Sequence, residues 1–121
     1  MNKKYLITGM LLIVALWFYF SPPRWWLNWI KDVDLSKPVT TGSALVEKYE
    51  CRSCHRIEGR GKFLGPKLDT VTERLDNVSL RIWLQNPRAI KWRTSMPNFD
   101  LSDSEIEAIV SYIHSVQEPT Q

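Results

Sequence analysis

Two cysteines stand three positions apart and are followed directly by a histidine, as Cys51, Cys54 and His55. This spacing is typical of segments that attach a c-type haem. If the segment is helical, the two thiols can add across the two porphyrin vinyl groups and become thioethers. The histidine can then supply the proximal nitrogen to iron. The sequence therefore predicts one covalent haem c and a protein that moves electrons.

Three other uses of a close cysteine pair fit the rest of the chain less well. Structural zinc normally has four ligands, whereas this chain has two cysteines and two histidines, and the second histidine, His114, is expected at the surface of a distant helix. A thioredoxin-like redox pair needs a βαβ pattern, and no convincing strand alternation occurs. A structural disulfide is disfavoured between cysteines this close.

A low-spin electron carrier needs a second axial ligand to iron, and Met96 is the candidate. The other methionines, Met1 and Met10, lie in the apolar N-terminal segment. Met96 lies in a predicted loop, and Pro97 restricts the backbone of the residue before it. A neutral thioether favours ferrous iron, whereas the alternative use of this methionine is as core filler. Iron closed on both faces leaves no site for oxygen or peroxide, so the sequence predicts an electron-transfer protein and no enzyme.

The N-terminal segment predicts an uncleaved membrane anchor. Residues 5–20 are almost wholly apolar and follow Lys3 and Lys4. A cleaved signal peptide also begins this way, but no small-x-small cleavage pattern follows the run. The positive-inside rule holds the N-terminus in the cytoplasm and predicts that the haem domain lies on the periplasmic side of the cell membrane.

A helix over residues 5–20 would be about 24 Å long, short of the roughly 30 Å hydrocarbon core. The span therefore needs flanking residues, and Trp25, Trp26 and Trp29 are suited to the headgroup level. The alternative is that some of these tryptophans contact a neighbouring membrane subunit.

The chain divides into an anchor with its tryptophan segment (residues 1–30), a polar linker (31–38) and a haem domain (39–121). The linker is too short to let the domain range far from the membrane. A domain of about 80 residues has a marginal core, and a covalent haem would stabilise it.

Helical periodicity predicts an all-α domain. The first helix is expected to begin near Thr41, with Thr40 or Thr41 as its cap, and short helices are expected over residues 68–74 and from about 78 to Pro87. A capping box of Ser102 and Glu105 marks the start of the last helix. The expected inward positions in these helices are Gly42, Leu45, Val46, Tyr49, Leu80, Trp83, Leu84, Ile106, Ile109, Val110 and Ile113.

Residues 40–116 resemble the class I monohaem cytochrome c family. The matching features, in chain order, are Gly42 and Val46 in the first helix, the Cys-x-x-Cys-His motif, the turn Gly65-Pro66-Lys67-Leu68, the pair Met96-Pro97, and Tyr112 in the last helix. The resemblance implies a haem crevice among helices, a Pro66 carbonyl that orients His55, and Met96 as the distal ligand. Val46 departs from the aromatic residue that is frequent there. Membrane anchors occur in several branches, including haem c subunits of nitric oxide reductases and oxidases.

Charge suggests the kind of partner. From Pro38 onward the chain has 11 basic and 11 acidic residues, so nothing favours nucleic acid. The basic residues gather near the haem motif and before Met96, where they would bind haem propionates or steer an acidic redox partner. They are Arg52, Arg56, Arg60, Lys62, Lys67, Arg88, Lys91 and Arg93, and Glu58 is the one acidic residue expected to oppose the first five.

The leading functional hypothesis is an electron-transfer subunit of a larger membrane redox complex, respiratory or photosynthetic. The runner-up is a free-standing anchored carrier between complexes. A haem sensor or peroxidase with a labile Met96 is the alternative of a different class.

Overall fold

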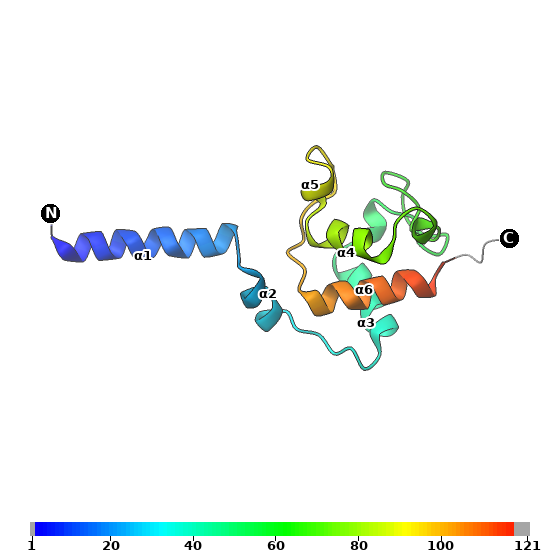
Figure 1. The fold of residues 1–121 in the computed structure, drawn as a ribbon, viewed down its shortest axis with the longest axis horizontal. Helices are drawn as coiled ribbons and strands as arrows, with labels where there is room; N and C mark the ends of the chain where they lie inside the picture. Colours follow the sequence, from blue (N-terminus) through cyan, green and yellow to red (C-terminus); the bar gives the residue numbers. More distant parts are fainter. Residues whose placement is uncertain (1, 118–121) are drawn as a thin grey trace.

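The computed structural model describes residues 2–117, and these are predominantly helical (Figure 1). The helices are α1 (Lys3–Phe20), α2 (Arg24–Ile30), α3 (Pro38–Lys48), α4 (Asn77–Gln85), α5 (Pro87–Ile90) and α6 (Asp103–Ser115), with 3₁₀ turns η1 (Cys51–Ser53) and η2 (Val71–Glu73). The described residues form no β-strand beyond one isolated bridge. The predicted all-α class is confirmed.

Helix α1 projects away from the rest of the chain in Figure 1. It has 18 residues, none of them buried against other parts of the protein, and it is long and apolar enough to cross a membrane once. It ends at Phe20, just before the Pro22-Pro23 pair, because a proline cannot donate a helical hydrogen bond. The apolar surface of α1 therefore does not pack against the haem domain.

The domain is built on a close crossing of α3 and α6 (Figure 1). A Cβ placed on Gly42 would lie 2.0 Å from the carbonyl oxygen of Ala108 and 2.7 Å from Cβ of Tyr112. No side chain fits there, so glycine permits the contact of the two backbones. Tyr112 thus lies at the crossing, where the family resemblance predicted an aromatic residue, and Val46 is buried in the core beside it.

The predicted inward faces are confirmed along α3, α4 and α6. The buried members of the core include Leu45, Val46, Leu80, Leu84, Ile106, Ile109, Val110 and Ile113. Tyr49 is half-buried and packs against this core, Trp83 is half-buried, and His114 is exposed, as expected. The capping box of Ser102 and Glu105 is present at the start of α6.

Two predictions about the helices are wrong: the start of the first helix of the domain, and the helix expected over residues 68–74. Helix α3 begins at Pro38 because proline suits the first turn of a helix, and the hydroxyl of Thr41 donates to the Asp34 carbonyl oxygen instead of capping. The helix expected over residues 68–74 is reduced to η2. The reason is that the backbone N–H of Leu68 and the buried carboxylate of Asp69 are both bonded to the haem-motif segment.

Helix α2 packs on the haem domain at the N-terminus of α6. Its Leu27 is buried, and Arg24 donates to the Leu101 carbonyl oxygen at 2.8 Å and pairs with the carboxylate of Asp103. The amide of Asn28 both donates to Asp103 (2.6 Å) and accepts from its backbone N–H (2.9 Å). These contacts satisfy a free N–H of the first turn of α6 and place α2 against that end of the domain.

The docking of α2 is expected to weaken in acid. Burial opposes ionisation of Asp103, but the hydrogen bonds from Asn28 and Arg24 outweigh it, so the pKa of Asp103 lies below its ordinary value. A carboxyl with a lowered folded-state pKa stabilises the fold fully above about pH 4 and loses this effect as the pH falls through the folded value. We expect wild type to melt at a higher temperature than Asp103→Asn at neutral pH, with the difference shrinking below about pH 4.

The control is Asp32→Asn, since Asp32 is exposed and has no side-chain partner among the described residues. Melting curves of the full chain in detergent between neutral pH and about pH 3 measure both differences. A gap between wild type and Asp103→Asn that does not change with pH would contradict the assignment.

Candidate haem-binding site

The two cysteines of the motif lie on a tight turn after α3. Glu50 takes a left-handed backbone conformation (φ 52°) and directs the chain from α3 into η1. The His55 N–H then bonds to the Cys51 carbonyl oxygen at 2.9 Å, which is a helical connection. Cys51 and Cys54 are both half-buried, and neither takes part in a disulfide. The local backbone is therefore the helical turn that the attachment chemistry was predicted to need.

The thiol chemistry argues against the alternative of a redox-active cysteine pair. Burial raises the pKa of the Cys51 thiol to about 11. Redox cysteines work as thiolates and have lowered pKa values. The described residues also contain no cluster of three His, Cys, Asp or Glu side chains able to hold a metal ion, so the structural zinc alternative gains no support.

The His55 ring is held on one edge. Its Nδ1 lies 2.8 Å from the carbonyl oxygen of Pro66, the contact that the resemblance implied. Gly65 lies close against the ring, since a Cβ on it would be 2.6 Å from Cε1 and 2.8 Å from Nδ1 of His55. A hydrogen bond from Nδ1 to Pro66 fixes the tautomer and leaves Nε2 with a free electron pair. An imidazole held in this way could bind a metal ion through Nε2.

The segment after the motif folds back along it. Its backbone N–H groups at Lys62, Gly65 and Leu68 donate to carbonyl oxygens of the motif segment, at 3.1, 2.8 and 3.0 Å. Gly61 (φ 108°) allows the return, because a Cβ there would lie 2.2 Å from the carbonyl oxygen of His55. The segment between the motif and Pro66 is thus an ordered support that brings the Pro66 carbonyl group to His55.

Met96 lies in the long connection between α5 and α6. Its side chain is half-buried and packs against the core, and its backbone N–H donates to Thr94 Oγ1 at 3.2 Å. Three residues later Phe99 packs on the core as well, its ring 5.5 Å from that of Tyr49. The loop is therefore attached to the domain at Met96 and again at Phe99.

The comparisons with known proteins decide the family. The family model described as cytochrome c matches residues 39–117. The chain belongs to the cytochrome c family. This cytochrome c carries one covalently bound haem c, and the pair Cys51 and Cys54 is its attachment motif. It is an electron-transfer protein.

Its relatives include components of a reductase. The C subunit of nitric oxide reductase from Halomonas halodenitrificans is 26% identical over 117 residues, which cover 87% of this chain and 78% of that protein. The corresponding protein of Paracoccus denitrificans is 29% identical over 93 residues, covering 69% of this chain and 62% of that protein. A solved structure, cytochrome c from Rhodothermus marinus, matches with a TM-score of 0.59 and 29% identity over 74% of this chain and 90% of that chain.

The surface around the motif suits a porphyrin. Phe63 and Leu64, between the motif and Pro66, are 69% and 76% exposed, and Trp92 near Met96 is 73% exposed. Two large apolar side chains thus stand exposed at neighbouring positions beside the motif, and a third stands close to Met96 in the chain. Together with two thiols and an oriented imidazole, they fit a large apolar disc held covalently at one edge.

The charge around the cytochrome c motif differs from the sequence prediction. Arg52 is largely buried, pairs with Glu47 and Glu58, and donates to the hydroxyl of Tyr112 at 2.9 Å. The hydrogen bond from Tyr112, with Arg52 nearby, lowers the pKa of Glu58. The sequence prediction that Glu58 alone opposes the cluster is therefore wrong.

Two more of the basic residues have acidic partners: Arg60 pairs with Glu58 at 3.5 Å and Lys67 pairs with Asp69 at 3.7 Å. Each pair joins residues only two positions apart, and the local conformation of the loop brings their charged groups together. Within the part of the chain that the structure describes, the members of this basic set without an ion pair are Arg56, Lys62, Arg88, Lys91 and Arg93. Arg56 and Arg93 instead lie over the rings of Phe63 and Trp92.

Proposed function

We propose that this cytochrome c is an anchored electron-transfer subunit of a larger membrane redox complex, with His55 and Met96 as axial ligands. The observation that carries the proposal is the joint presence of an apolar helix α1 and a haem domain whose relatives are named as subunits of a reductase. In this proposal α1 crosses the cell membrane and the haem domain lies on its extracytoplasmic side, as Lys3 and Lys4 predict.

The protein residues act by holding the cofactor and its surroundings fixed. The bound haem supplies reversible one-electron chemistry at iron. Pro66 fixes the orientation and tautomer of His55 through Nδ1, and Gly65 lets the backbone lie close against the ring. In this proposal Met96 would also hold the haem iron, and its thioether would favour the reduced state and help to exclude water and gases. Fixed ligands keep reorganisation small when the electron moves.

The junction between α1 and the domain supports a fixed position at the membrane. Two prolines follow α1, and the ring of Phe18 at its end packs edge-on against Trp25 and Trp26, at centroid distances of 6.3 Å. Helix α2 in turn is bonded to α6. A haem held at a fixed distance from the membrane and in a fixed orientation is suited to electron transfer to a neighbouring subunit. It is less suited to shuttling over long distances, and this disfavours the free-standing carrier.

Purification with native partners tests the proposal. The protein is extracted from its own membranes in mild detergent, separated on a native gel with in-gel haem staining, and its band is analysed by mass spectrometry. A band of high mass that contains other membrane redox subunits is expected. Migration alone, at the mass of one chain in its detergent micelle, would instead identify a free-standing carrier.

An acidic redox partner is a second element of the proposal, and the unpaired Arg88, Lys91 and Arg93 favour it. We expect the bimolecular rate of electron exchange with an acidic redox protein to fall about tenfold between low and high salt, the lower end of electrostatic steering. Stopped-flow mixing at several ionic strengths measures the rate. Lys91→Gln should flatten this dependence.

The matched control is Lys37→Gln, which removes the same charge from an exposed side chain at the start of α3. It should leave the salt dependence unchanged. Equal effects of both substitutions, or a wild-type rate that does not respond to salt, would remove the case for steering by this surface.

A further inference from the structure

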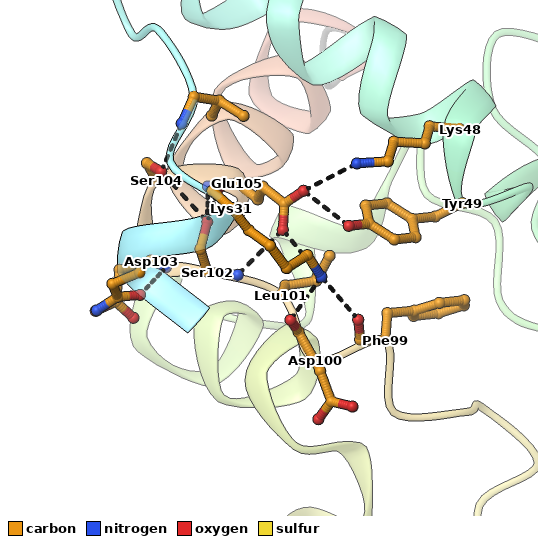
Figure 2. Close-up of polar contacts among 12 residues, drawn as sticks. Lys31, Lys48, Tyr49, Phe99, Asp100, Leu101, Ser102, Asp103, Ser104 and Glu105 are labelled. Carbon is orange, nitrogen blue, oxygen red and sulfur yellow. Dashed lines mark hydrogen bonds and ion pairs between the residues drawn. The ribbon is translucent and has the colours of Figure 1, made fainter. Parts of the chain in front are cut away.

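Lys31 connects the juxtamembrane segment to the loop that carries Met96. It is the first residue after α2, and its ammonium donates to the carbonyl oxygens of Phe99 (3.2 Å) and Asp100 (2.7 Å). Figure 2 shows the side chain extended between these two carbonyl groups and the carboxylate of Glu105. A lysine from the predicted linker thus bonds to the backbone just beyond Met96.

The carboxylate that faces Lys31 is buried and fully engaged. Glu105 Oε2 lies 3.4 Å from the Lys31 ammonium and accepts from the Ser102 N–H at 3.1 Å. Its Oε1 accepts from the hydroxyl of Tyr49 at 2.7 Å and lies 3.5 Å from Lys48 Nζ (Figure 2). Burial and the bond to Glu105 raise the pKa of Tyr49 well above its ordinary value, so its hydroxyl stays a donor.

Other bonds join the same two segments. The hydroxyl of Ser102 donates to the Lys31 carbonyl oxygen at 2.7 Å, and the Val33 N–H donates to Ser104 Oγ at 3.1 Å. Arg24, one helix earlier, donates to the Leu101 carbonyl oxygen. Residues 24–33 therefore bond to every position from Phe99 to Ser104.

We propose that residues 24–33 form a clamp on the Met96 loop, with Lys31 as the positioning residue that holds the loop closed. The Lys31 ammonium binds two backbone carbonyl groups at the C-terminal end of the loop and neutralises the buried carboxylate of Glu105. Because Glu105 belongs to α6 and also contacts Lys48 of α3, Lys31 links the loop to both helices. In this proposal residues 24–33, which follow the membrane anchor, help to hold the haem-binding loop in place. The role of the clamp toward iron rests on the proposed Met96 ligation, whereas the clamp itself does not.

Hydrogen exchange on the full haem-loaded chain in detergent tests the clamp. In Lys31→Met, which keeps the apolar stem, we expect amides of residues 98–102 to exchange about tenfold faster, the effect of one lost charge-assisted hydrogen bond on an opening equilibrium. Lys31→Arg should restore protection, because a guanidinium can donate to the same oxygens. Lys37→Met is the matched control and should change nothing. Unchanged exchange at 98–102, or an equal rise throughout α4 and α6, would overturn the clamp.

Ligand spectroscopy on the same variants tests the link to Met96. Wild-type ferric protein should show the weak sulfur-to-iron charge-transfer band at the red end of the spectrum, and added imidazole should displace Met96 about tenfold faster in Lys31→Met. If wild type shows the band but imidazole displaces Met96 at the same rate in wild type and Lys31→Met, the positioning role of Lys31 is refuted. A wild type without the band would refute Met96 ligation itself, and amide exchange would then decide the clamp alone.

Discussion

Replacing Met96 with histidine is expected to lower the midpoint potential of the haem by about 0.1 V or more, within the roughly 0.8 V that axial ligands span. The physical reason is that imidazole donates more strongly than a thioether and stabilises ferric iron, whereas the thioether favours the reduced state. Redox titration of the full chain in detergent, followed in the visible spectrum, measures the change.

Met96→Ala makes the complementary test, because it removes the donor without supplying another. Reduced wild type should not bind carbon monoxide at neutral pH, and reduced Met96→Ala should bind it. The control is Met10→Ala, in the exposed apolar surface of α1, which should leave both the potential and the gas response unchanged. Carbon monoxide binding by reduced wild type would support the sensor or peroxidase alternative.

Replacing Gly42 with alanine is expected to cost about 3 kcal/mol or more, because overpacking a tight contact costs about 1–3 kcal/mol and more when backbone must move. The added methyl carbon would lie 2.0 Å from the Ala108 carbonyl oxygen, so the crossing of α3 and α6 must open. Since domains are stable by only about 5–15 kcal/mol, we expect a much lower yield of haem-loaded protein and a lower melting temperature.

Gly9→Ala is the matched control for this substitution. It is the same change within a helix, but a Cβ at Gly9 meets no atom within 4 Å outside its own helix. Haem-stained gels and thermal melting of both variants in detergent compare the two positions. A Gly42→Ala protein that matches Gly9→Ala in haem content and melting temperature would show that the crossing can relax.

The helices and the haem motif could be predicted because their signals are local. Cys51, Cys54 and His55 stand within one turn of chain, and the apolar stripe of α6 repeats at the helical period. The role of Pro66 beside His55 followed from the resemblance to a family and not from any spacing, since the hydrogen bond joins residues eleven positions apart.

Two of the predictions that failed depended on how the turns and loops after α3 fold. The helix over residues 68–74 has adequate local propensity, but Asp69 accepts a hydrogen bond from the backbone of Glu58, and this contact decided the conformation. The basic surface was overestimated because the turn after α3 brings the carboxylates of Glu47 and Glu58, five and six positions from Arg52, onto its guanidinium.

The sequence by itself determined the cofactor chemistry, the all-α class and the apolar N-terminal helix, because a haem motif, helical periods and a long apolar run are encoded by neighbouring residues. Only the tertiary structure decided that residues 24–33 pack on the start of α6 and that Lys31 bonds beside Glu105. Lys31 and Glu105 are 74 positions apart, and a lone lysine in a polar stretch has the same sequence signature as a solvated one. Its partner is set by the path of the folded chain.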